Sequence, residues 1–399
     1  MSDAEPLATD FDETAILAEA RDHAGLDDFG DEGFREPLRV LLSSLENEAN
    51  LHAAGRVAQR ARIVDSLITR LRTQDHLTRH PEILSERIEA PLFVVGLPRT
   101  GTTLLQRMLA SDPDVNALLW WECRSPAPWP DSPWRNGRDP RIDSAHAQVR
   151  AILEARPELA SIHPWDPEGP DEEILLLEHT FLSQVPESGA HVPRYRAWIT
   201  DQDPTPAYAY LHRLLQFLQW QKRESGRLGR GWVLKSPCHL GCLEVLLRVF
   251  PDARIVQTHR DPLETIPSIA SMYCSLWSLA TDGFDEREVG RQCRERFVWA
   301  LDRCLEARRR LPADRFLDVA YRDVVSHPLE TARKIHAFAG RTLSPSAEAA
   351  GLRFLEEHAR EKRPPHRYTR ERFGFSADGL ARDFAAYRER FLPGIGVPA

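Results

Sequence analysis

Five consecutive residues combine the features of an anion-binding loop: Arg99, Thr100, Gly101, Thr102 and Thr103. An apolar run at positions 92–95 predicts a buried strand before them, and the residues after them predict a helix. Free backbone N–H groups and the positive end of the helix dipole would meet at this loop, where the arginine adds charge and the threonines add hydroxyl donors. The pattern predicts a site for a tetrahedral anion such as phosphate or sulfate.

The loop departs from the Walker A motif of ATP-binding proteins. Gly96 and Gly101 have the spacing of that motif, but Thr102 stands where the motif has lysine. This weakens an interpretation as an ordinary ATPase or kinase. A strand, a turn and a helix can also show such a pattern by chance, so a second segment is needed to decide.

A second anion site is predicted after another β-branched run at positions 254–258. Asp261 and Pro262 have the types expected at the start of a helix. Two turns of that helix can bring the Ser268 hydroxyl back toward Arg260 at the end of the strand. Two neighbouring anion sites suggest a nucleotide phosphorylated at two positions.

At these residues the chain resembles the sulfotransferases that use 3′-phosphoadenosine-5′-phosphosulfate (PAPS), especially the bacterial branch with a Leu-Pro-Arg-[Ser/Thr]-Gly-Thr-Thr loop. The resemblance implies that residues 99–103 hold the 5′-phosphosulfate and that Arg260 and Ser268 bind the 3′-phosphate. It extends over roughly residues 90–390 through these further segments: Trp120-Trp-Glu-Cys, Pro170-Asp-Glu-Glu, Trp232-Val-Leu-Lys-Ser-Pro-Cys-His, Tyr321-Arg-Asp-Val and His366-Arg-Tyr-x4-Phe-Gly.

Sulfuryl transfer requires cations around the reacting group and a base for the acceptor proton. We expect Arg99 and Lys235 to be the cations, with Arg99 acting as a clamp and not as a proton donor because arginine does not readily lose its proton. Lys235 ends a predicted strand, at the edge of the sheet where ligands bind. No metal is expected in this chemistry.

Two residues are candidates for the base, and the sequence does not choose between them. Related bacterial carbohydrate sulfotransferases use a glutamate in the region of Glu122, although a helix cap or a structural ion pair would equally explain that residue. Cytosolic sulfotransferases carry a Lys-Thr-His segment that Lys235-Ser-Pro-Cys-His239 resembles with two extra residues, and His239 could instead cap a helix. Asp171, Glu172, Glu173 and His179 are further candidates for acceptor contacts.

The C-terminal part contains a basic cluster that includes Arg363 and Arg367. In relatives, a segment at this place closes over the 3′-phosphate and the adenine, so the resemblance implies that these arginines bind the nucleotide. The Arg-Lys-Gly motif of the cytosolic enzymes is missing. Which of the basic residues reach the nucleotide, or whether they form a solvated turn, is left open by the sequence.

The order of predicted elements indicates an α/β fold with a parallel sheet, of the P-loop nucleotide-kinase-like type. Helical patterns at positions 14–22, 34–46 and 53–72 predict a helical N-terminal extension over residues 1–88, followed by the sulfotransferase domain at 89–399. Within this domain we expect strands at 232–235, 254–258 and 315–319, a helical substrate-covering insertion at about 135–225, and a closing segment at about 358–399.

The composition and the net charge of the chain limit the kinds of partner that it can bind. The chain has 399 residues and a net charge of −8, which argues against nucleic acid and anionic membranes. The N-terminus lacks the basic and apolar regions of a secretory signal, and no apolar run approaches the ~20 residues of a membrane helix, so a cytoplasmic bacterial enzyme is expected. We expect a small hydroxylated or amino acceptor, release of 3′-phosphoadenosine-5′-phosphate (PAP), and a homodimer through the N-terminal helices as one option.

Two other classes of function are open at this stage. One is a P-loop kinase that uses ATP, which the missing Walker lysine and the lack of a clear acidic magnesium ligand disfavour. The other is a catalytically silent nucleotide-binding scaffold. The joint presence of Arg99, Lys235, Arg260 and Ser268 argues against the scaffold.

Overall fold

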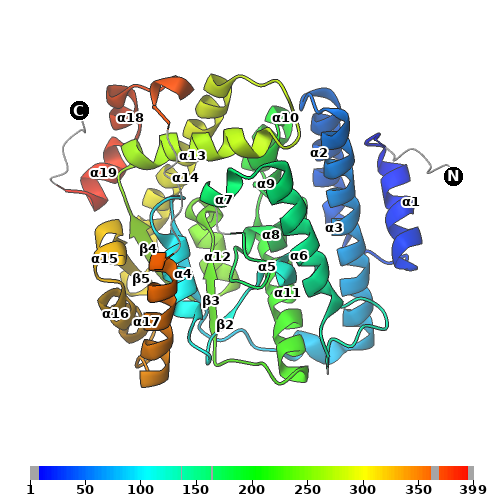
Figure 1. Cartoon of the computed structure of the whole chain (residues 1–399), viewed down its shortest axis with the longest axis horizontal. Coiled ribbons are helices and arrows are strands. Elements are labelled where there is room, and N and C mark those ends of the chain that lie inside the picture. Colours follow the sequence, from blue (N-terminus) through cyan, green and yellow to red (C-terminus); the bar gives the residue numbers. More distant parts are fainter. Residues whose placement is uncertain (1–8, 136, 163–164, 361–367, 394–399) are drawn as a thin grey trace.

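The fold centres on a parallel β-sheet (Figure 1). A computed structural model describes residues 9–135, 137–162, 165–360 and 368–393. Within these ranges the sheet has five strands in the order β2-β3-β1-β4-β5. The strands are β1 (Leu92–Gly96), β2 (Asn116–Ala117), β3 (Trp232–Lys235), β4 (Arg254–His259) and β5 (Phe316–Ala320). The α/β class and the parallel sheet are confirmed.

The strands bury side chains on both faces, as a parallel sheet covered by helices requires. Phe93 on β1 aligns with Leu234 on β3 and with Ile255 on β4, and all three belong to one apolar core. Their neighbours Val94 and Val256 belong to a second core on the opposite face. The alternation along each strand therefore produces two cores, one under each layer of helices.

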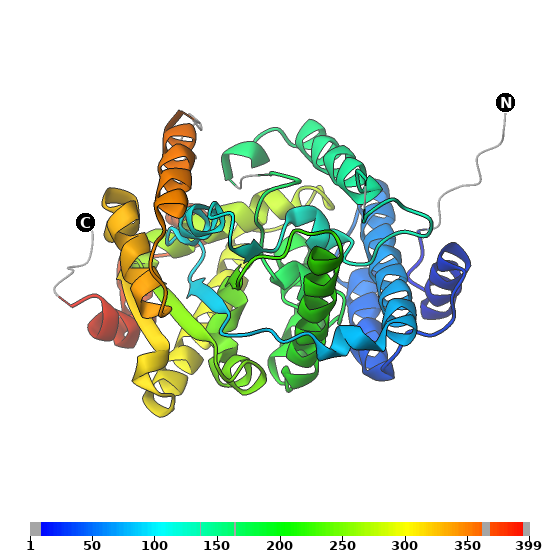
Figure 2. The same cartoon turned by 90° about the horizontal axis from the view of Figure 1, so that it is seen from below.

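Helices form both layers, and the two views show them on either side of the strands (Figure 2). The first core includes residues of α11 (Thr205–Glu224), α12 (Leu243–Val249), α13 (Pro262–Trp277) and α14 (Glu286–Arg310). The second core includes residues of α4 (Thr102–Ala110) and α16 (Pro328–Phe338), and α17 (Pro345–Arg360) packs against it. The other helices of this part are α5 (Trp120–Arg124), α6 (Pro140–Ala155), α7 (Leu159–Ile162), α8 (Ile174–Glu178), α9 (Val185–Gly189), α10 (Pro193–Thr200), α15 (Tyr321–Ser326), α18 (Ala377–Asp383) and α19 (Ala385–Phe391).

The N-terminal part is helical, as the periodicity of its apolar residues predicts. It contains α1 (Glu13–Ala24), α2 (Arg35–Asn47) and α3 (Ala53–Arg79), which share a core of their own with Phe181 and Tyr195. Figure 1 shows these helices at the end of the molecule opposite α15 to α17. The division of the chain at residue 88 into an extension and a domain stays a prediction.

Two segments differ from the expected pattern. The edge strand β2 has only two residues, too few for a periodic signal. The helical insertion expected at about 135–225 is interrupted after α8: Phe181 has a φ of 59°, a left-handed conformation that a right-handed helix cannot include. Across the described residues, no helix has both the length and the apolar character needed to cross a bilayer.

Candidate functional site

The anion loop lies between the end of β1 and the start of α4. Arg99 and Gly101 have positive φ values of 73° and 83°, a conformation that costs glycine little. Gly101 is the N-cap residue of α4, and no side chain caps this helix. The first N–H groups of α4 are therefore available to an anion, together with the positive end of the helix dipole.

The side chain of Thr100 has a structural role. It is fully buried, donates a 2.6 Å hydrogen bond to the carbonyl of Leu97, and lies 2.7 Å from the hydroxyl of Thr258 on the neighbouring strand β4. These contacts fix the path of the loop. Of the residues predicted to bind the anion, Thr100 can thus contribute its backbone and not its hydroxyl group.

Lys235 reaches the anion loop from β3. Its Nζ donates a 3.3 Å hydrogen bond to Thr103 Oγ1 and a second hydrogen bond to a carboxylate oxygen of Glu172. Its backbone N–H donates a 2.8 Å hydrogen bond to Glu173. The Lys235 side chain is 1% exposed, whereas that of Glu172 is 20% exposed. The structure thus brings a cation, a hydroxyl group and a solvent-accessible carboxylate together at the start of α4.

Arg260 also meets the loop. Its Nη1 donates a 3.0 Å hydrogen bond to the carbonyl of Arg99, its Nη2 lies 2.8 Å from a carboxylate oxygen of Glu264, and the guanidinium lies 4.2 Å from the ring centre of Tyr321. The predicted helix start is confirmed, since Asp261 caps α13 by accepting from the N–H of Leu263. Ser268 lies on α13 and is buried.

His239 lies behind Lys235 in the short 3₁₀ turn η3 (Pro237–Cys242) and is fully buried. Its Nε2 is 2.6 Å from Glu173 and its Nδ1 is 2.7 Å from the hydroxyl of Tyr208. Burial opposes a charge on His239, but Cys238 and the hydrogen bond to Glu173 raise the pKa of His239 to about 10. Both ring nitrogens of His239 therefore have buried partners, Glu173 and Tyr208.

Glu122 is part of a buried ion pair. One carboxylate oxygen accepts a 2.6 Å hydrogen bond from Nζ of Lys222 on α11, and the other accepts from the N–H of Leu119 at the start of α5. The Glu122 side chain is 2% exposed. This arrangement matches the ion-pair alternative for this residue, and no contact joins Glu122 to the anion loop among the hydrogen bonds of the described residues.

The remaining candidates divide into two groups. Arg363 and Arg367 lie outside the described residues. Glu172, by contrast, is brought to the site, although the sequence offered it only as one of several acceptor contacts. The acidic pair at positions 172 and 173 could signal its importance, but no periodicity distinguishes the residue facing Lys235 Nζ from the one facing His239. In the described residues, no group of three or more His, Cys, Asp or Glu side chains is arranged to hold a metal ion.

Comparison with known proteins defines the class to which this fold and site belong. The model of the sulfotransferase family matches residues 91–345. The chain belongs to this family, and the resemblance carried by the loop at 99–103 is confirmed at the level of the family.

Solved structures agree with this assignment. The sulfotransferase STF1 of Mycobacterium tuberculosis H37Rv is 30% identical, with a TM-score of 0.81 over 96% of this chain and 100% of that chain. The sulfotransferase STF9 of Mycobacterium avium is 29% identical, with a TM-score of 0.85 over 98% of both chains. The similarity to these two structures therefore extends over the helical N-terminal part as well as the sheet.

A curated relative is similar over a shorter region. The omega-hydroxy-beta-dihydromenaquinone-9 sulfotransferase Stf3 of Mycobacterium tuberculosis (strain CDC 1551 / Oshkosh) is 24% identical over 264 residues, which are 63% of this chain and 63% of that protein. The match thus spans less than two thirds of the relative.

Proposed function

We propose that this protein transfers the sulfuryl group of PAPS to a hydroxyl or amino group of a small acceptor and releases PAP. The observation that carries the proposal is the meeting of Lys235 Nζ, Thr103 and Glu172 at the uncapped start of α4. A cation and free N–H donors suit a transferred oxyanion, and an adjacent carboxylate suits an acceptor that must lose a proton.

The residues present fit the anionic ends of PAPS. The uncapped helix start supplies N–H donors for the 5′-phosphosulfate. Arg260, 28% exposed, is fixed beside that loop by the carbonyl of Arg99 and would bind the 3′-phosphate with Ser268. Bound PAPS supplies an activated sulfur–oxygen bond, and the chain supplies the charges and donors around it.

We assign the role of base to Glu172. It is the carboxylate that contacts Lys235 and keeps solvent access, whereas Glu122 and His239 are engaged by buried partners. Glu172 accepts the acceptor proton as the acceptor oxygen or nitrogen bonds to sulfur. The sulfur–oxygen bond to the 5′-phosphate breaks at the same time, and the electron pair leaves with PAP.

Lys235 and Arg99 stabilise the charge that moves toward the leaving phosphate. Lys235 is held in place by its backbone N–H, which donates to Glu173, and by the side chains of Thr103 and Glu172. Such a preorganised cation needs little rearrangement as charge develops. Arginine at position 99 keeps its charge throughout, so it serves as a clamp and not as a proton donor.

The name of the relative Stf3 includes a hydroxylated menaquinone derivative, which supports a hydroxyl acceptor. The similarity to mycobacterial structures supports a bacterial enzyme. A cytoplasmic location and a homodimer stay predictions.

Calorimetric titration with PAP, and separately with ATP plus magnesium, tests the donor. We expect saturable binding of PAP and little response to ATP, followed by transfer of radiolabelled sulfate from PAPS to members of a panel of alcohols and amines. Binding of ATP with magnesium but not of PAP would establish the kinase alternative. Binding of PAP without transfer to any acceptor would support the catalytically silent scaffold.

A further inference from the structure

A cavity of about 690 Å³ lies apart from the anion loop, lined by α8, the segments 182–184 and 199–204, α11, η3, α12 and α14. Its volume is in the range of small-molecule sites. Neither Thr103, Glu172 nor Lys235 lines it. A molecule in this cavity would therefore not meet the reacting group, and the cavity requires an explanation separate from the nucleotide site.

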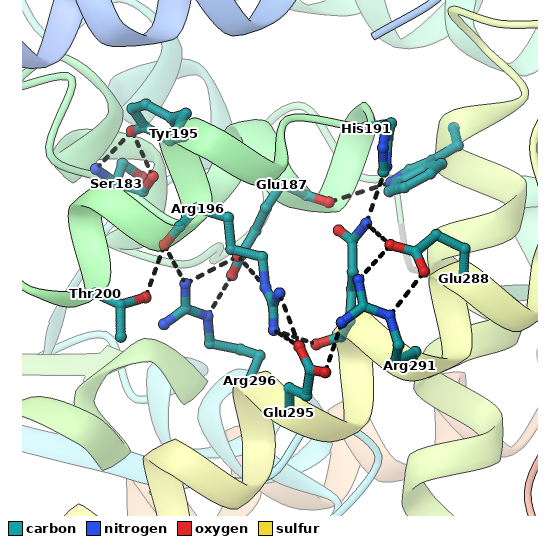
Figure 3. A network of polar contacts seen from close by, with 12 residues as sticks. Ser183, Glu187, His191, Tyr195, Arg196, Thr200, Glu288, Arg291, Glu295 and Arg296 are labelled. Atoms are coloured by element: carbon teal, nitrogen blue, oxygen red, sulfur yellow. Dashed lines mark hydrogen bonds and ion pairs between the residues drawn. The ribbon is translucent and has the colours of Figure 1, made fainter. Parts of the chain in front are cut away.

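The inner part of the cavity carries a buried arginine. Arg296, with its side chain 3% exposed, donates to Glu187 through Nε at 2.7 Å and Nη2 at 2.9 Å. Within the described ranges, no hydrogen-bond partner is found for its Nη1. Figure 3 shows this remaining nitrogen directed away from the Glu187 carboxylate. Because Arg296 lines the cavity, this nitrogen is a donor for an oxygen acceptor of a ligand.

An aromatic wall lies beside this arginine. The Trp299 ring has Arg296 5.0 Å from its centre and Arg303 5.5 Å from it. A Cβ at Gly241 would lie 2.3 Å from the Trp299 ring, so the glycine allows the indole to pack against η3. Leu177 and Val245 add apolar surface to the same cavity. Such a wall suits a flat or apolar molecule.

Charge selects among such molecules. Arg296 and Arg303 both lie beside the Trp299 ring, and the Glu187 carboxylate is shared between Arg296 and Arg196. The other charged lining residues are at the surface or paired: Asp201, Asp203 and Arg248 are exposed, and Glu244 pairs with Arg310. A carboxylate directed inward would accept from Arg296 Nη1 and pair with this buried guanidinium.

We propose that this cavity is a second small-molecule site, which binds an aromatic or apolar monocarboxylate between Trp299 and Leu177 with its carboxylate on Arg296. The site also touches the reaction centre indirectly. Tyr208 lines the cavity and its hydroxyl is 2.7 Å from His239, whose partner Glu173 accepts from the backbone of Lys235. A ligand that contacts Tyr208 is thus linked to Lys235 through His239 and Glu173.

The test uses 2-naphthoate as the probe and 2-naphthamide as its uncharged counterpart, titrated into the full chain by calorimetry with and without saturating PAP. We expect saturable naphthoate binding that persists with PAP and weaker binding of the amide. Displacement by PAP would assign the probe to the nucleotide site and overturn the proposal. Absence of saturable naphthoate binding would also overturn it.

Three variants locate the probe. Val245→Phe fills the cavity and should abolish binding, whereas Val249→Phe changes a valine of the same helix that does not line the cavity and should leave binding unchanged. Arg303→Met, at an exposed position, should weaken naphthoate binding roughly fivefold and spare the amide. Unchanged naphthoate binding in a folded Val245→Phe protein would show that the probe binds elsewhere. The result does not depend on sulfuryl transfer.

Discussion

The guanidinium of Arg260 donates a 3.0 Å hydrogen bond to the backbone carbonyl of Arg99, which joins two loops separated by 161 positions. The contact fixes Arg260, which is predicted to bind the 3′-phosphate, beside the loop that is predicted to bind the 5′-phosphosulfate. Both loops follow neighbouring parallel strands, β1 and β4. Arg260 therefore has two expected effects: it binds phosphate, and it holds the unusual backbone of Arg99.

Replacing Arg260 tests the first effect directly. Arg260→Ala should weaken PAP binding by about 10- to 100-fold, because hydrogen bonds to charged groups contribute about 1.5–3 kcal/mol. Arg322→Ala is the matched control, since that side chain is 87% exposed. Calorimetry with PAP measures both. Equal PAP affinity in wild type and Arg260→Ala would remove Arg260 from the nucleotide site.

Lys235 should act on the chemical step more than on binding. Lys235→Met retains an apolar stem but removes the cation beside Thr103 and Glu172, and we expect single-turnover transfer to slow by about 10²- to 10³-fold. Lys334→Met provides the control, with a side chain that is 62% exposed on α16. A loss of PAP affinity as large as the loss of rate would instead indicate a role in ground-state binding.

Glu172→Gln keeps the size of the side chain and removes its ability to take a proton. We expect transfer to fall by about 10²- to 10⁴-fold with PAP binding retained, as measured by transfer from labelled PAPS once an acceptor is known. Glu168→Gln is the control in the same segment, since Glu168 pairs with His146 in an exposed position. Near-normal transfer by Glu172→Gln would show that Glu172 is not the base and would leave Glu122 and His239 as the candidates.

His239 should contribute mainly to stability. Because folding raises its pKa from 6.5 to about 10, its contribution is fully present below pH 6.5 and is lost as the pH rises through about 10. His239→Gln should lower the free energy of unfolding by about 3 kcal/mol near neutral pH, and the difference from wild type should shrink toward pH 10. Urea unfolding at pH 6, 8 and 10 measures this. A difference that is constant over this range would contradict the protonated pair.

The anion loop, Lys235 and Arg260 could be predicted from the sequence because each lies at the end of an apolar strand. Parallel strands bring such positions together at one edge of the sheet. The sequence could not assign the base. The roles of the three candidates depend on partners that are far away in the sequence. Glu122 pairs with Lys222, Glu172 with Lys235, and His239 with Glu173. Burial and pairing at such distances arise only when the helices of the insertion pack, so residue type alone left these roles open.

The ion pair of Glu122 and Lys222 separates a structural role from a catalytic one. Glu122→Gln should destabilise the protein by about 3–5 kcal/mol, since it leaves Lys222 charged without its buried partner. Adding Lys222→Met removes that charge and should restore much of the stability, because a buried ion pair contributes little compared with apolar residues of similar volume. The Lys222 Nζ lies 5.7 Å from the centre of the Trp232 ring, so the end of the methionine side chain would meet an aromatic surface.

Transfer activity measured on the same proteins completes this test. If Glu122 is structural, the double variant should regain activity together with its stability, because the side-chain carbonyl of the introduced glutamine can still accept from the N–H of Leu119 as Glu122 does. Urea unfolding and PAPS-dependent transfer are measured side by side. A stable double variant that remains inactive would identify Glu122 as the base in place of Glu172.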